Sequence, residues 1–127
     1  MIDTGSVTDR RSVSADGRSA TFPETPVGRA AREYLRVYNE GDTVRIRQFL
    51  EARVVRRPDD TRTIDERVAA FRAMHRQMGD LTPLRVTPSG ENELTISAHS
   101  SDGVVTIVFT VEREAPNRIT GIRVQQG

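Results

Sequence analysis

The chain has 127 residues, no cysteine, and a formal net charge of +1 from 19 basic and 18 acidic side chains. That length suffices for one domain with a buried core, and the lack of cysteine excludes disulfides, zinc–thiolate sites and thiol catalysis. A nearly neutral chain gives no electrostatic reason to expect nucleic acid or an anionic membrane as a partner. No stretch approaches the ~20 apolar residues of a membrane span and none has the pattern of a signal peptide, so we expect a cytoplasmic protein.

All of the basic residues are arginine, and lysine is absent. Codon usage in a GC-rich bacterial genome is the simpler interpretation, and a need for bidentate guanidinium contacts is the alternative. Recognition of an anionic ligand by arginine is the weakest of the functional hypotheses, because most of the arginines concerned are expected to be exposed to solvent. They are Arg36, Arg45, Arg47, Arg56 and Arg57.

Residues 1–24 are rich in polar residues without periodicity and predict a mobile tail, followed by a single domain over residues 25–127. A short strand from Ser19 to Phe22 is the alternative for the end of this tail. Thr25 followed by Pro26 predicts the start of a first helix, which Gly41 ends. Its buried face is expected to consist of Val27, Ala30, Ala31, Tyr34, Leu35 and Tyr38.

Two further helices are predicted before the sheet. Asp42 can cap a short helix that buries Ile46, Phe49 and Leu50. The segment RVVRRPDDTR predicts an exposed connection, in which two valines form at most one small strand. Thr63 and Glu66 match a capping box that starts a third helix. Its inward residues are expected to be Ile64, Val68, Phe71, His75 and Met78, and Gly79 ends it.

After Gly79 the apolar residues alternate, which predicts strands. The strongest signal is the pair of strands between Val104 and Val124, joined by the polar turn from Arg113 to Asn117. The inward strand positions are expected to be Leu84, Val86, Leu94, Ile96, Ala98, Val105, Ile107, Phe109 and Val111. The fold class is therefore α+β, with three helices packed on one face of a four-stranded antiparallel meander. The opposite face suits solvent or a sheet-to-sheet dimer, since it carries Thr95, Ser97, Thr106, Val108 and Thr110.

Several short motifs occur in a characteristic order: YNEGD closes the first helix, FL lies in the second, DERV opens the third, MGDL leads into the sheet, and VEREAPNRITGIRV ends the chain. With this order the chain resembles the NTF2-like (cystatin-like, SnoaL-like) superfamily over roughly residues 25–125. It looks most like the small NTF2-like domains that accompany bacterial serine hydrolases of the beta-lactamase class. The resemblance implies a curved sheet around a long helix, a conical cavity, frequent homodimers and a serine hydrolase as partner. It implies no particular reaction, because this fold carries isomerases, hydrolases, cyclases and binding domains.

His75 is the sharpest candidate for a catalytic residue, because an imidazole on the apolar stripe of the third helix could act as a general base inside the cone. The alternative is that His75 has no catalytic role and is a partly buried histidine hydrogen-bonded to a neighbour. Tyr34 and Tyr38 could present hydroxyls to a carbonyl or oxyanion, or could be core residues. The residues expected to line an apolar pocket are Tyr34, Tyr38, Phe71, His75, Met78, Ile96 and Phe109.

No inward strand position carries a carboxylate, and His75 and His99 lack the spacing of metal ligands, so we expect no metal and no cofactor. The clustered Asp59, Asp60, Asp65 and Glu66 are interpreted as exposed capping residues. Neither a GxSxG nor an SxxK motif is present. The first hypothesis is thus a non-catalytic domain for binding a small apolar ligand, for dimerisation or for support of a partner. The second is a cofactor-independent isomerase or cyclase with His75 as base, which requires a cavity of about 300 Å³ around it.

Overall fold

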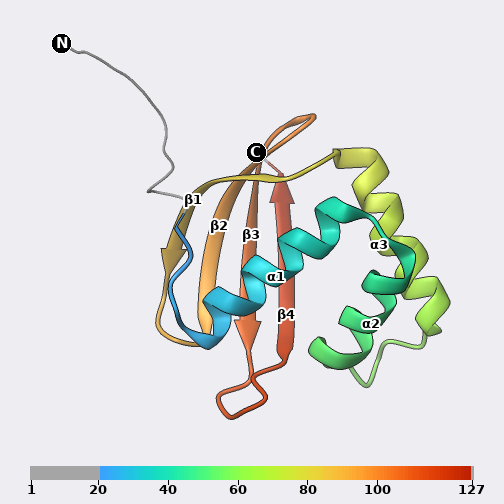
Figure 1. Cartoon of the computed structure of the whole chain (residues 1–127), viewed down its shortest axis with the longest axis horizontal. Helices are drawn as coiled ribbons and strands as arrows, with labels where there is room; N and C mark the ends of the chain where they lie inside the picture. Colours follow the sequence, from blue (N-terminus) through green and yellow to red (C-terminus); the bar gives the residue numbers. More distant parts are fainter. Residues whose placement is uncertain (1–20, 127) are drawn as a thin grey trace.

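The structure, a computed structural model, describes residues 21–126. Most of the predicted tail, and part of the alternative strand at residues 19–22, lie outside the described residues. The elements in chain order are α1 (Pro26–Glu40), α2 (Thr43–Arg53), α3 (Ile64–Met78), β1 (Thr82–Pro88), β2 (Glu93–Ser100), β3 (Gly103–Val111) and β4 (Ile119–Gln126). The strands pair antiparallel in the order β1-β2-β3-β4, which confirms the predicted α+β meander. Figure 1 shows α1 crossing one face of the sheet, with α2 and α3 together beyond β4.

Local hydrogen bonds at the helix ends explain why the helices begin where the sequence predicts. The Thr25 hydroxyl and the Asp42 carboxylate accept backbone N–H groups at the starts of α1 and α2. At the start of α3 the Glu66 N–H donates to Thr63 Oγ1 at 3.1 Å, and the Thr63 N–H donates back to Glu66 Oε1 at 2.8 Å. Gly41 ends α1 with φ of 70°, a left-handed conformation that glycine adopts without steric cost.

The hydrophobic core lies between α1 and the inner face of the sheet. Burial alternates strictly along β2 and β3, so their inward residues are buried as predicted: Leu94, Ile96, Ala98, Val105, Ile107, Phe109 and Val111. On the outer face the five residues predicted for it are partly exposed: Thr95, Ser97, Thr106, Val108 and Thr110. A dimer through this face stays a prediction.

The prediction for β1 is wrong at one residue. Leu84 was expected to face the core, but 43% of its surface is exposed. The pairing of β1 with β2 shifts by one residue between Pro83 and Arg85, so Leu84 is the extra residue of a β-bulge. The bulge leaves Pro83 and Val86, three positions apart, as the partly buried residues of the strand. The alternation of apolar and polar residues along one strand cannot reveal the bulge, because the bulge depends on how that strand pairs with its neighbour.

The C-terminal end of α1 is joined to the start of the sheet. The Asn39 side-chain amide donates to the Leu81 carbonyl at 2.9 Å, and the Leu81 N–H donates to Asn39 Oδ1 at 2.8 Å. One side chain therefore satisfies both backbone groups of a residue that is 99% buried. This pair fixes the turn between α3 and β1 against α1.

The segment before α1 also packs against the domain. Phe22 is partly buried against the core. The segment can lie this close to α1 because residue 28 is a glycine: a Cβ atom there would lie 2.0 Å from the Pro23 carbonyl oxygen. Phe22, which falls within the predicted tail of residues 1–24, therefore packs against the domain.

The connection between α2 and α3, residues 54–63, lies against the edge strand β4. The Val55 N–H donates to the Ile119 carbonyl at 2.8 Å, and Val54 forms an isolated parallel bridge with Ile119. The small strand predicted at these valines is therefore a single bridge. None of the helices within residues 21–126 has the length and apolar character to cross a bilayer.

Candidate functional site

The predicted pocket residues form a packed aromatic group on the inner side of α1. The Tyr34 ring lies 5.1 Å from the Phe109 ring and 5.4 Å from the Phe71 ring, measured between centroids, in edge-to-face contacts. Tyr38 lies 5.7 Å from Phe71 in the same manner. These distances are those of aromatic pairs in contact. Of the seven predicted pocket residues, all but His75 are buried in the core.

His75 is placed at the end of α3 and is partly exposed, with 28% of its side-chain surface accessible. Its Nε2 atom lies 2.7 Å from Oδ1 of Asp80, which is an exposed carboxylate. Its ring meets the Tyr38 ring edge-on, with centroids 5.0 Å apart. The structure thus brings His75 together with Tyr38 and Asp80, and a role as general base stays a prediction.

The two tyrosine hydroxyls differ in their surroundings. Tyr38 donates its O–H to the Gly79 carbonyl at 3.0 Å, whereas Tyr34 makes no hydrogen bond within residues 21–126. Burial raises the pKa of Tyr38 to about 12, and the Asp80 carboxylate adds to the shift. Burial, together with Tyr38, raises the pKa of Tyr34 still further. Both phenols are therefore neutral at physiological pH.

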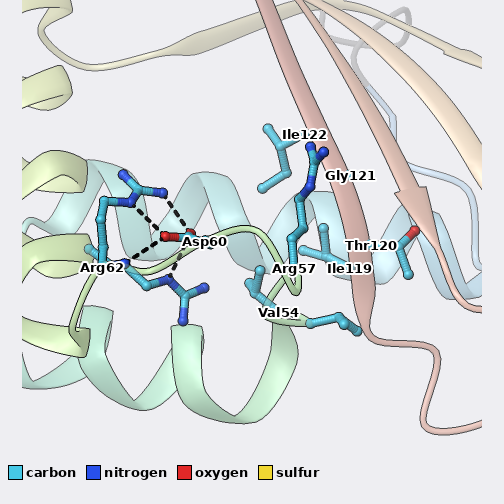
Figure 2. A pocket seen from close by; sticks show the side chains of 10 residues that line it. Val54, Arg57, Asp60, Arg62, Ile119, Thr120, Gly121 and Ile122 are labelled. Atoms are coloured by element: carbon cyan, nitrogen blue, oxygen red, sulfur yellow. Dashed lines mark hydrogen bonds and ion pairs between the residues drawn. The ribbon is translucent and has the colours of Figure 1, made fainter.

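A pocket of about 270 Å³ lies elsewhere, between β4 and the α2–α3 connection. We call it the Asp60 pocket. It is lined by Val54, Val55, Arg57, Asp60, Arg62, Arg67, Ile119, Thr120, Gly121 and Ile122. In Figure 2, dashed lines join Asp60 to Arg62 on one side of the pocket, while Arg57, Ile119 and Ile122 lie on the other. The side of Ile119 and Ile122 is therefore aliphatic apart from Arg57, and the side of Asp60 is charged.

The Asp60 carboxylate is held by Arg62 through both oxygens. Oδ1 accepts the Arg62 backbone N–H and the Arg62 Nε–H, each at 3.0 Å, and Oδ2 accepts from Nη2 at 2.9 Å. These bonds, more than the nearby charge of Arg67, hold the pKa of Asp60 far below its ordinary value. Asp60 is therefore ionised at neutral pH. The prediction that it is an exposed capping residue is wrong, because only 17% of its side chain is accessible.

Further arginines either hold the backbone of the charged wall or line other parts of the pocket. Arg56 donates from Nε to the Asp60 carbonyl at 3.1 Å and from Nη2 to the Arg62 carbonyl. Arg57 is 72% exposed and pairs only loosely with the exposed Asp59, at 3.4 Å. Arg67, from the first turns of α3, is 89% buried and lies 3.9 Å from the Asp60 carboxylate. The lining thus holds three guanidinium groups and one carboxylate.

Two of these pocket residues, Arg62 and Arg67, were missed by the sequence analysis. A signal for Arg67 exists, since it lies three residues after Ile64 and four before Phe71, on the apolar stripe of its helix. An arginine at such a position is expected to be buried. Within residues 21–126 no three His, Asp or Glu side chains are grouped as metal ligands would be.

Among solved structures, the chain is similar to a putative polyketide cyclase from Sinorhizobium meliloti. The TM-score is 0.58 at 18% sequence identity, and the match covers 86% of this chain and 100% of the other. The chain has an NTF2-like fold. Likeness at this identity concerns the NTF2-like fold alone, and the narrower resemblance to domains beside beta-lactamase-class hydrolases stays a prediction.

A DUF4783 family protein from Bacteroides ovatus ATCC 8483 matches with a TM-score of 0.45 at 9% identity, over 84% of this chain and 97% of the other. No protein-family model matches the chain, and no curated protein matches it either.

Proposed function

We propose that this chain is a non-catalytic, NTF2-like domain that binds a small organic molecule in the Asp60 pocket. The observation that carries the proposal is the composition of this pocket. Val54, Ile119 and Ile122 offer an aliphatic wall, and the Asp60–Arg62 pair lies opposite. Its volume of about 270 Å³ is close to the lower end of the range for small-molecule sites.

The state of Asp60 supports a binding role over acid–base catalysis. A general base must accept a proton near neutral pH, and its pKa is best placed close to the operating pH. The hydrogen bonds from Arg62 lower the pKa of Asp60 instead, so this carboxylate is a poor proton acceptor. His75, the base of the alternative hypothesis, is not among the residues that line the pocket.

The similarity to a putative polyketide cyclase agrees with a small organic ligand. A cyclase reaction in this chain would require an acid or base beside the bound molecule. Ligand binding needs no acid or base. It mainly needs apolar surface against which the ligand can be buried, and the aliphatic wall provides that surface.

The test is to titrate isotope-labelled protein with 2-naphthol, a neutral bicyclic probe, and to follow backbone amide signals by NMR. We expect shifts that centre on Val55, Thr120 and Gly121, which line the pocket. The variant Ile122→Phe should weaken binding, because it adds a ring to the pocket wall.

The matched control is Val124→Phe. Val124 lies on the same strand and face, two residues further on, and is also partly buried, but it does not line the pocket. This variant should bind 2-naphthol as the unmodified chain does. Shifts centred on Tyr34 and Phe71, or equal effects of the two variants, would refute the proposal.

A further inference from the structure

The guanidinium of Arg67 is buried without a hydrogen bond. Only 11% of the side chain is accessible, and its contact with a charged partner in the described part of the chain is Nε to Asp60 Oδ2 at 3.9 Å. Hydrogen bonds between nitrogen and oxygen span about 2.7–3.2 Å. The guanidinium therefore lines the pocket without a hydrogen-bond acceptor for its five N–H donors among residues 21–126.

Asp60 does not compensate for this charge. Its two oxygens already accept three hydrogen bonds from Arg62, and the single negative charge is matched by the Arg62 guanidinium. Two other acids lie nearby. Asp59 is paired with Arg57 at the exposed end of the pocket. Glu66, whose charge acts on Arg62, accepts the Thr63 N–H. Neither gives Arg67 a hydrogen-bonded anion.

A cation in this position is costly unless an anion joins it. A guanidinium has donors only, so an acceptor, and above all an anionic one, is the partner that would satisfy it. Burial of an ion without hydrogen bonds is unfavourable, because the ion loses its hydration and gains no partner in exchange. A bound anion would remove this cost, which makes the pocket selective for negative charge.

We infer that Arg67 binds the carboxylate of a small ligand whose apolar body lies against Val54, Ile119 and Ile122. This inference rests on the proposed function and specifies the ligand class. A carboxylate matches the planar fork of a guanidinium, which can donate two parallel hydrogen bonds to it. A phosphate could use the same fork, but it would leave the aliphatic wall unused.

The test compares two probes of the same shape, 2-naphthoate and 2-naphthamide, with NMR titration of the Gly121 and Val55 amide signals. The carboxylate should bind roughly tenfold more tightly or better, because charge-assisted hydrogen bonds are about twice as strong as neutral ones. In Arg67→Met the ratio of the affinity for 2-naphthoate to that for 2-naphthamide should fall to about one. The matched control Arg72→Met, on the exposed side of the same helix, should retain the preference.

Arg67→Met should fold, since it replaces an incompletely paired buried cation with an apolar side chain of similar length. If it does not fold, Arg67→Lys serves instead. It keeps the charge but lacks the planar fork, so the preference for 2-naphthoate should shrink without vanishing.

The inference is overturned if the unmodified chain shows no preference for 2-naphthoate, or if Arg67→Met or a soluble Arg67→Lys retains the whole preference. It is also overturned if inorganic phosphate binds at Gly121 as tightly as 2-naphthoate. In each of these cases unaltered binding of 2-naphthol leaves the proposed function standing. If no naphthalene probe affects Gly121, both fail.

Discussion

The ring of Tyr34 lies 5.1 Å from the ring of Phe109, at an interplanar angle of 71°. This contact joins the inner face of α1 to the centre of β3 and places a phenol hydroxyl within an otherwise apolar core. Tyr34 makes no hydrogen bond within residues 21–126, although only 2% of its surface is exposed. The aromatic rings therefore contribute by packing in the core, and the hydroxyl of Tyr34 contributes no hydrogen bond to its stability.

Removal of the two hydroxyls should have opposite consequences. Tyr34→Phe should leave the free energy of unfolding unchanged or raise it, because an unpartnered polar group is removed from the core. Tyr38→Phe should lower it by about 1 kcal/mol, because the hydrogen bond to the Gly79 carbonyl is lost. Urea denaturation measures both. An equal loss in the two variants would mean that Tyr34 has a hydrogen-bond partner.

High pH should unfold the protein as its tyrosines ionise. The folded pKa of Tyr38, about 12, exceeds its ordinary value of 10.0. The stability linked to this difference is complete below pH 10 and is lost as the pH rises from 10 towards 12. Phenolate absorbance and circular dichroism should therefore change together in a pH titration. A rise in phenolate absorbance near pH 10 with unchanged circular dichroism would contradict this expectation.

The Asp60–Arg62 pair should make the free energy of unfolding fall as the pH becomes acidic. The folded pKa of Asp60 is lowered from an ordinary 3.8, so its contribution is present above about pH 4 and is lost as the pH falls through the folded value. Asp60→Asn should therefore reduce the urea midpoint at pH 7, and the difference from the unmodified chain should shrink towards pH 2. Asp59→Asn is the control, since the Asp59–Arg57 pair is exposed. A pH-independent difference for Asp60→Asn would argue against the ion pair.

Gly28 should not tolerate a side chain. In Gly28→Ala the new Cβ would lie 2.0 Å from the Pro23 carbonyl, so the segment before α1 must move and Phe22 must leave the core. A loss of about 1–3 kcal/mol in the free energy of unfolding is expected from such overpacking. The matched control is Gly121→Ala, where the nearest atoms, those of Thr110, would be 3.9 Å away. Equal stability of the two variants would show that residues 21–24 do not pack as described.

Sequence reasoning predicted the helices and the central strands because their signals are local. The capping box of Thr63 and Glu66 lies within four residues, and the alternation along β3 lies within nine. The position of Leu84 could not be predicted in this way, because its bulge is fixed by the pairing of β1 with β2.

The Asp60 pocket is harder to predict, since it joins segments that are distant in the sequence. Val54 forms its bridge with Ile119, a residue far away in the sequence, and Arg62 reaches Asp60 through a turn of the α2–α3 connection. The charge clusters in RRPDDTR resembled an ordinary solvated turn. The position of Arg67 on an apolar stripe was the one local indication of a buried charge.

The two hydrogen bonds between Asn39 and Leu81 join residues 42 positions apart. They fix the ends of the segment that contains α2, the α2–α3 connection and α3, so changes within that segment need not disturb the packing of α1 on the sheet. Loop-closure entropy changes slowly with length, by about 0.6 kcal/mol for each doubling. Insertions among the exposed residues 57–59 should therefore cost little loop-closure entropy. The α2–α3 connection, which forms one wall of the pocket, is thereby separated from the scaffold of α1 and the sheet, so that this wall can be redesigned while the scaffold is kept.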